Sequence, residues 1–146
     1  RDLVRSRGLG DVYKRQAMTP QTEFLNKLLD TVEKNCTLDS PVSTKELSDK
    51  NSLYAELGDG YTETTYFDKT EVKTIPVLFL SRHKDQQRCM EQLCDISNYL
   101  QRLKEYPQGE LFRWLDCTTA KQPSKIGRDE DGTYHYSCVI NCKIYF

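Results

Sequence analysis

The last fourteen residues, 133–146, carry the pattern that most restricts the fold. Aromatic, cysteine and isoleucine side chains occupy every second position; they are Tyr134, Tyr136, Cys138, Ile140, Cys142, Ile144 and Phe146. Alternation with a period of two places these side chains on one face of a β-strand. The segment therefore predicts a long strand with one buried face, which needs neighbouring strands and a covering layer.

Two segments show helical spacing instead. Residues 20–34 have apolar side chains three or four positions apart, Thr19 is a suitable N-cap, and Pro20 suits the first helical position. Residues 85–104 form a longer amphipathic stretch that ends at a Tyr-Pro-Gln-Gly segment. The apolar stripe of this second helix consists of Cys89, Leu93, Ile96, Leu100 and Leu103.

Four further strands are predicted from apolar runs between turn signals. They cover residues 53–57, 64–68, 72–81 and 111–118, and Pro76 indicates an edge position or a bulge in the third. Polar loops are predicted at 37–52, with a short helical turn at 43–47, and at 58–63 and 119–132. The resulting order, α-β-β-β-α-β-β, predicts an α+β fold in which a long amphipathic helix packs on a mostly antiparallel sheet, with an additional N-terminal helix.

Residues 1–17 differ from the rest of the chain. They show neither helical nor strand periodicity, and they resemble the translation of a sequencing adapter. We therefore expect a non-native leader at 1–17 and one domain at 18–146 that begins with Met18. The alternative is a genuine basic arm.

Charge and hydropathy exclude several classes of protein. The net charge is −1, and residues 1–17 hold five basic against two acidic side chains, so the remainder carries −4. An acidic body gives no reason to expect specific nucleic-acid binding, which depends on clustered Lys and Arg. The sequence has neither an apolar run of membrane-spanning length nor a secretory signal, so we expect a protein made in the cytosol with reduced cysteines.

The six cysteines do not have the spacing of a metal site. Cys138 and Cys142 lie on one face of one strand about 13 Å apart, and Cys89 and Cys94 lie too far round a helix to share an ion. We interpret the cysteines as small buried side chains. Contacts between Cys89 and Cys117, or between Cys94 and Cys138, are possible across the helix and the sheet, but nothing selects either.

No catalytic or cofactor-binding motif is present in the sequence. His83 lies at a strand–helix junction, and His135 is expected to face solvent or a partner. Residues 129–132 resemble part of a calcium loop, but the position that should hold the last ligand is Cys138. We therefore expect no enzyme, no cofactor and no metal, and a small metal-dependent hydrolase remains the alternative from a different class.

The two polar loops at 58–63 and 119–132 are the candidate interaction surfaces, because long polar loops are often functional. The Tyr-rich strand that follows the second loop offers an edge to another chain. The candidate interface residues are Asp59, Tyr61, Lys121, Lys125, Arg128, Asp129, Tyr134 and Tyr136.

Four stretches of the chain resemble the minor capsid proteins of Gram-positive siphophages, which are similar to phage tail terminators. They are Leu-Gly-Asp-Gly at 57–60 with Tyr-Phe-Asp at 66–68, residues 73–86, Ile-Ser-Asn-Tyr-Leu at 96–100, and residues 123–129 with 132–137. The resemblance implies a virion structural protein that is assembled in the host cytoplasm. It also implies a ring of copies, typically six, that caps the tail tube and contacts the tail-tube protein and the head connector. A head-closure adaptor of the same phage neck is the alternative within this class.

Overall fold

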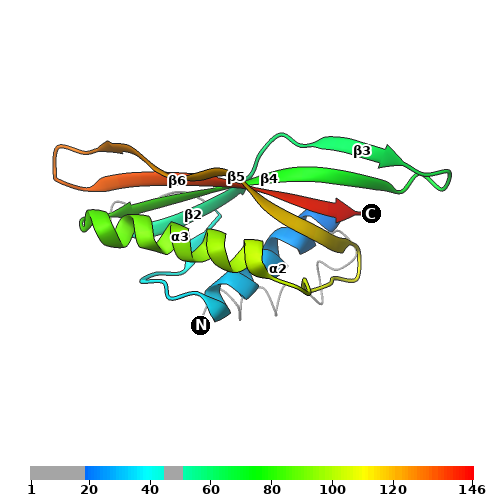
Figure 1. The fold of residues 1–146 in the computed structure, drawn as a ribbon, viewed down its shortest axis with the longest axis horizontal. Helices are drawn as coiled ribbons and strands as arrows, with labels where there is room; N and C mark the ends of the chain where they lie inside the picture. The colour runs from blue at the N-terminus through cyan, green and yellow to red at the C-terminus, as the bar shows by residue number, and fades with distance from the viewer. Residues whose placement is uncertain (1–18, 45–50) are drawn as a thin grey trace.

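The computed structural model describes residues 19–44 and 51–146, which form a six-stranded sheet with two helices on one side (Figure 1). The expected leader at 1–17 lies outside the described residues. The elements are α2 (Pro20–Asn35), β1 (Val42–Ser43), β2 (Ser52–Leu57), β3 (Tyr61–Thr65), β4 (Glu71–His83), α3 (Gln86–Arg102), β5 (Arg113–Arg128) and β6 (Tyr134–Tyr145).

The sheet is mixed and mostly antiparallel, with the strand order β1-β2-β4-β6-β5. β3 also pairs with β4, along the half of β4 that β2 leaves free, and only the β1–β2 pair is parallel. The α+β class, the N-terminal helix and the antiparallel sheet predicted from the sequence are confirmed. β1 was not predicted: Ser43 belongs to it rather than to a helical turn, and residues 45–50 of that segment lie outside the described residues.

Each helix begins at a side-chain cap, and the cap of the first helix, Thr19, is the one predicted from the sequence. Thr19 accepts a hydrogen bond from the backbone N–H of Thr22 at 3.2 Å, and Pro20 opens α2. Asp85 accepts hydrogen bonds from the N–H groups of Gln87 and Arg88, at 3.1 and 3.5 Å, at the start of α3. These carboxylate and hydroxyl oxygens satisfy N–H groups that have no partner within the helix.

Pro76 lies in the interior of the sheet, contrary to the prediction of an edge strand or a bulge. β4 pairs with β6 without a register shift through Pro76. On its other side β4 pairs with β3 up to Thr74 and with β2 from Val77 onward, so Pro76 falls at the gap between the two partners. Its carbonyl accepts from the N–H of Gly58 at 2.7 Å. In a strand, the carbonyl and the nitrogen of one residue face the same neighbour. The nitrogen of Pro76 therefore faces the gap between β3 and β2, where its missing N–H removes no hydrogen bond between paired strands.

Two predicted loops are strands. β3 begins at Tyr61, three residues before the predicted strand, and β5 continues to Arg128 through most of the predicted loop at 119–132. β5 pairs with β6 through four register irregularities, the last between Lys125 and Gly127. At each irregularity the regular alternation of buried and exposed side chains is broken, so the sequence of β5 lacks the period-two pattern that identifies a strand.

The core lies between the sheet and the helices and confirms the predicted buried face of β6. Tyr136, Cys138, Ile140, Cys142 and Ile144 are all at most 5% exposed. The end of the core beneath α2 is aromatic: the Phe24 ring packs edge-on against Phe112 and Trp114, with ring centroids 5.6 and 5.1 Å apart. Edge-to-face packing of this kind adds about 0.5–1.5 kcal/mol to the burial of each ring pair.

Among residues 19–44 and 51–146, neither helix combines the length and the apolar character that crossing a membrane requires.

Candidate assembly surfaces

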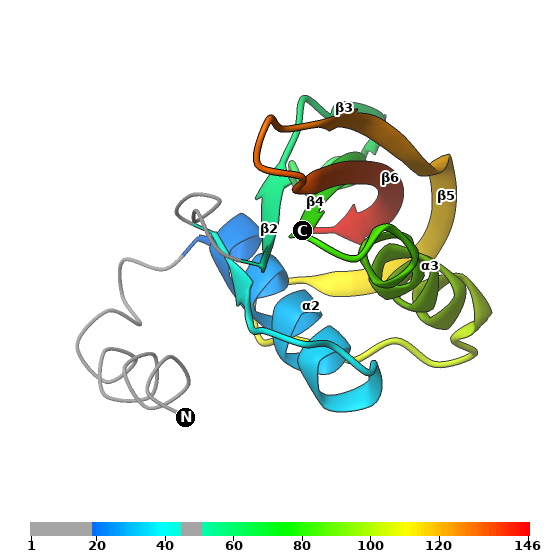
Figure 2. The ribbon, with the colours of Figure 1, turned by 90° about the vertical axis from the view of Figure 1, so that its left-hand side faces the viewer.

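The structure separates the predicted interface residues into two groups on opposite margins of the sheet. Asp59 and Tyr61 lie at the start of β3, on the outer side of β4. Lys121, Lys125 and Arg128 lie on β5, which is the last strand on the other side. Viewed along the strands, the sheet curves around the helices and β5 forms its margin (Figure 2).

β5 presents an exposed, basic edge. Lys121, Lys125, Ile126 and Arg128 are exposed, and Ile126 is 59% exposed. None of the three cations forms an ion pair among the described residues, and residues 119–128 hold no acidic side chain, so their net charge is +3. An unpaired strand edge of this kind can accept a strand from another chain, and lysines on an edge discourage unspecific pairing.

The two tyrosines of β6 that were predicted for this surface differ in their environments. Tyr134 is half-buried, and its ring lies beneath Lys125 Nζ and the Arg128 guanidinium, 5.2 and 5.6 Å from the ring centroid. Tyr136 is 5% exposed, and its hydroxyl accepts from Gln86 Nε2 at 3.0 Å. Tyr134 thus orients the cations of β5, whereas Tyr136 belongs to the core.

Asp129 holds the turn between β5 and β6. Its Oδ2 lies 2.9 Å from Arg82 Nη2 on β4 and 3.0 Å from His135 Nε2 on β6. The backbone completes the turn, since the Asp129 N–H donates to Thr133 and Gly132 adopts a φ of +88°. His135 therefore contacts Asp129 within the chain, which corrects the expectation that it faces solvent or a partner.

Asp131 fixes the same turn from its other side. Its Oδ1 accepts from the N–H of Thr133 at 3.0 Å. The contact with Thr133 lowers the pKa of Asp131 below its ordinary value. The acidic run at 129–131 is thus partly a structural device of the hairpin.

β3 is the opposite free edge, and all five of its residues are exposed. Tyr61 is 62% exposed. Glu63 turns across the open face of the sheet, where its carboxylate lies 3.2 Å from Lys143 Nζ and accepts from the Thr74 hydroxyl at 3.0 Å. Residues 59–69 hold three acids and one lysine, a net charge of −2, which is opposite in sign to the β5 edge.

The turn after β3 presents an aromatic side chain on a rigid tip. Phe67 is fully exposed, and the β3–β4 hairpin projects past the helices at one end of the molecule (Figure 1). Asp68 Oδ1 accepts from both the N–H and the hydroxyl of Thr70, at 3.1 and 2.5 Å. The Thr70 and Tyr145 hydroxyls lie 2.9 Å apart, which ties the tip to β6.

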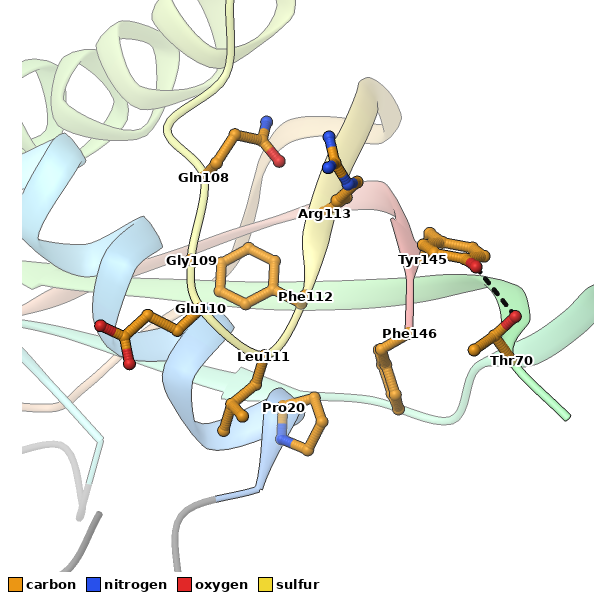
Figure 3. Close-up of a pocket in the computed structure, with 10 residues that line it drawn as sticks. All are labelled: Pro20, Thr70, Gln108, Gly109, Glu110, Leu111, Phe112, Arg113, Tyr145 and Phe146. Atoms are coloured by element: carbon orange, nitrogen blue, oxygen red, sulfur yellow. Dashed lines mark hydrogen bonds between the residues drawn. The ribbon is translucent and has the colours of Figure 1, made fainter. Parts of the chain in front are cut away.

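An open groove of about 490 Å³ lies beside this tip (Figure 3). Leu111, Phe112, Phe146 and Pro20 supply apolar walls, and the hydrogen bond between Thr70 and Tyr145 closes one side. None of the predicted interface residues lines the groove. Its location depends on the 103–112 connector, for which the sequence predicted the end of a helix, a stop at 106–109 and a strand from residue 111, whereas β5 begins at Arg113.

Metal chemistry finds no support in the described part of the chain. Across residues 19–44 and 51–146, His, Cys, Asp and Glu side chains nowhere converge in groups of three or more that could hold an ion. Burial raises the pKa of Cys138 to about 12, so its sulfur stays a protonated thiol at neutral pH. Cys138 is therefore a packing residue rather than an activated nucleophile.

The described residues form an α+β fold in which the free edges of β3 and β5 carry opposite charge and a hairpin projects at each end. The model of the family described as bacteriophage tail terminator protein matches residues 39–146, and the chain belongs to this family. Tail terminators are structural, non-enzymatic components of the phage virion. No curated protein matches the chain.

Proposed function

We propose that copies of this tail terminator close into a ring that caps the tail tube and joins the tail to the head. Family membership supports the capping role. The observation that carries the ring is that two of the free edges among the described strands, β3 and β5, lie on opposite margins of one sheet. A head-to-tail contact between two different surfaces of one chain generates a ring when its rotation closes.

The strand directions suit this contact. Along the path β3-β4-β6-β5 every neighbouring pair is antiparallel, so β3 and β5 also run in opposite directions. When the next copy is related by rotation about an axis roughly parallel to the strands, its β3 meets the first residues of β5, 113–116, in an antiparallel arrangement, because these segments lie at the same level of the sheet. The alternation then continues from copy to copy, and the junction gains backbone hydrogen bonds that each edge lacks alone.

Charge guides the approach of two copies, although the cations of β5 lie nearer the β5–β6 turn than the segment 113–116 that is level with β3. The β5 edge carries Lys121, Lys125 and Arg128, whereas residues 59–69 have a net charge of −2. Complementary charge selects the register of an interface and raises its association rate more than its affinity. Two β5 edges repel one another, so a head-to-tail junction is preferred to a symmetric one.

The two hairpins supply the ends of the ring. The β5–β6 turn and the β3–β4 turn project at opposite ends of the long axis of the molecule (Figure 1). In a ring whose axis follows the strands, one set of turns faces the last ring of the tube and the other faces the head connector. Docking on the tube covers the surface to which another tube ring would bind, which stops growth.

Charge reversal on β5 tests the junction. The triple variant Lys121→Glu, Lys125→Glu and Arg128→Glu should fail to form the ring in light scattering, while its melting temperature stays that of the wild type. The matched control reverses three exposed cations away from both edges, Lys34, Lys104 and Arg102, and should still assemble. Equal loss of assembly in both triple variants would show that total charge, and not the β5 edge, is responsible.

A compensating variant makes the test specific for pairing with β3. Asp59→Lys and Thr64→Lys change the net charge of residues 59–69 from −2 to +1 and leave the Glu63–Lys143 pair intact. Combined with the reversed β5 in one chain, these changes should restore assembly. A chain that stays monomeric with tail-tube protein but binds the head connector would instead indicate a head-closure adaptor.

A further inference from the structure

Cys117 and Cys142 face each other inside the sheet. They are register partners on β5 and β6, and their Sγ atoms lie 3.2 Å apart. Both thiols are free, and their side chains are 2% and 0% exposed. Neither pair of cysteines that the sequence suggested corresponds to this contact.

The backbone geometry matches the requirements of a disulfide. Directly opposed residues of an antiparallel pair have Cα atoms about 4.5–5.5 Å apart, and disulfides span about 4.4–6.8 Å between Cα atoms. The two sulfurs need to approach by about 1 Å to reach bonding distance. Rotation of the side chains within the existing strand pair is sufficient for such a movement.

The surroundings of the two cysteines slow their oxidation, but local opening of β5 can expose Cys117 to a reagent. Trp114 Nε1 donates to Cys117 Sγ at 3.2 Å. Burial, and then the hydrogen bond with Cys117, raises the pKa of Cys142, so Cys142 reacts slowly while the strand is closed. β5 is an edge strand with a register shift between Trp114 and Asp116, so local opening of β5 exposes Cys117 first.

We propose that Cys117 and Cys142 form a dithiol site that a small disulfide such as glutathione disulfide oxidises to an intramolecular cross-strand disulfide. The Cys117 thiolate attacks one sulfur of the reagent, which forms a mixed disulfide and releases one glutathione thiolate. The Cys142 thiolate then attacks Cys117 Sγ and releases the second. The two thiol protons end on the released glutathione molecules, so the protein loses two hydrogens and the reagent is reduced.

The disulfide links the basic edge strand, β5, covalently to β6, the strand beside it in the sheet. Virion proteins leave a reducing cytosol for an oxidising medium, where disulfides persist. The strand would then be adaptable during assembly and fixed afterwards. The chemistry of the pair is independent of the proposed ring, because both sulfurs belong to one chain.

The test incubates the folded full-length chain with glutathione disulfide, alkylates the remaining thiols under denaturing conditions, and maps the cross-linked peptides by mass. The expected product has one disulfide between Cys117 and Cys142, a mass two hydrogens lower before alkylation, and a higher melting temperature that dithiothreitol reverses. Glutathione adducts confined to the half-exposed Cys36 and Cys94, or a disulfide between any other pair, would overturn the proposal.

Two variants provide matched controls. Cys94→Ser should form the same disulfide as the wild type, because Cys94 is not part of the pair. Cys142→Ser should form none. If Cys142→Ser does not fold, the peptide map of the wild type still decides the question, because it identifies the bonded sulfurs directly.

Discussion

Individual side chains that resemble functional groups mainly stabilise the hairpins and connectors of this protein. Asp129 joins Arg82 to His135 at the β5–β6 turn. Gln108 behaves similarly in the connector before β5: its Oε1 accepts from the N–H of Trp114, and its Nε2 donates to the carbonyl of Trp114, both at 3.0 Å. A polar side chain in an irregular segment replaces backbone partners that a strand or helix would provide.

Gly60 is required by a close approach of the backbone. A Cβ at this position would meet the carbonyl oxygen of Thr74, and the Cα of Ile75 would lie 3.2 Å away. Gly60→Ala should therefore lower the free energy of unfolding by about 1–3 kcal/mol. Urea denaturation followed by circular dichroism measures the effect.

Gly127 is the control for this substitution, because a Cβ there meets nothing within 4 Å. Gly127→Ala should change the free energy of unfolding by at most about 0.5 kcal/mol. If the two alanine variants were equally stable, the close approach at Gly60 would not limit the choice of residue.

The faces of the cysteines were predictable from the sequence, but their partners were not. Period two in 133–146 correctly placed Cys138 and Cys142 on the buried face. The contact between Cys142 and Cys117 depends on the register of β5 against β6, which a bulge between Trp114 and Asp116 shifts. One inserted residue changes every subsequent pairing, and the sequence contains no signal for it.

At the scale of elements, strong periodicity decided which segments were predicted correctly. α2, α3, β4 and β6 each bury a continuous stripe or face, and the sequence shows it. β3 exposes all five residues and β5 exposes most of its second half, so neither has an apolar pattern to mark its ends. The length of β6 was the available signal, because its largely buried residues 136–140 need a partner strand on each side.

The N-cap of α3 should contribute measurably to stability. Asp85→Ala removes the acceptor for the N–H groups of Gln87 and Arg88, and the free energy of unfolding should fall by about 1 kcal/mol. Asp85→Ser keeps a capping oxygen and should retain most of the stability, as measured by urea denaturation. A serine variant as unstable as the alanine variant would argue against capping as the cause.

Asp39 joins the connector after α2 to α3 and makes this attachment sensitive to acid. Hydrogen bonds from Arg88, and then from His83, hold the pKa of Asp39 below its ordinary value of 3.8. Because the folded-state pKa is depressed, the stabilisation is complete above the unfolded pKa and is lost as pH falls through the folded value.

Asp39→Asn should therefore lower the melting temperature at pH 7, and the difference from the wild type should shrink below about pH 4. Thermal scans across that range measure both effects. Asp59→Asn, an exposed carboxyl on the β2–β3 turn, is the control and should change little. A deficit of the same size at neutral and acidic pH would show that the charge of Asp39 is not involved.

At the scale of the whole molecule, the sequence led to the correct family and fold, but it predicted loops where the structure has strands. These two loops were the candidate interaction surfaces. The structure instead has two strand edges, and they lie on opposite margins of the sheet, where one copy can meet the next. A polar strand and a polar loop have similar composition, so only the pairing with β6 distinguishes them.

The most direct test of the proposed ring is the mass of the purified full-length chain in solution, measured by light scattering on a sizing column with and without tail-tube protein. The head-to-tail pairing of β3 and β5 predicts a closed oligomer of defined mass, formed alone or on the tube, that the Lys121, Lys125 and Arg128 reversal abolishes. A monomer under both conditions, or an oligomer unaffected by that reversal, would contradict the account.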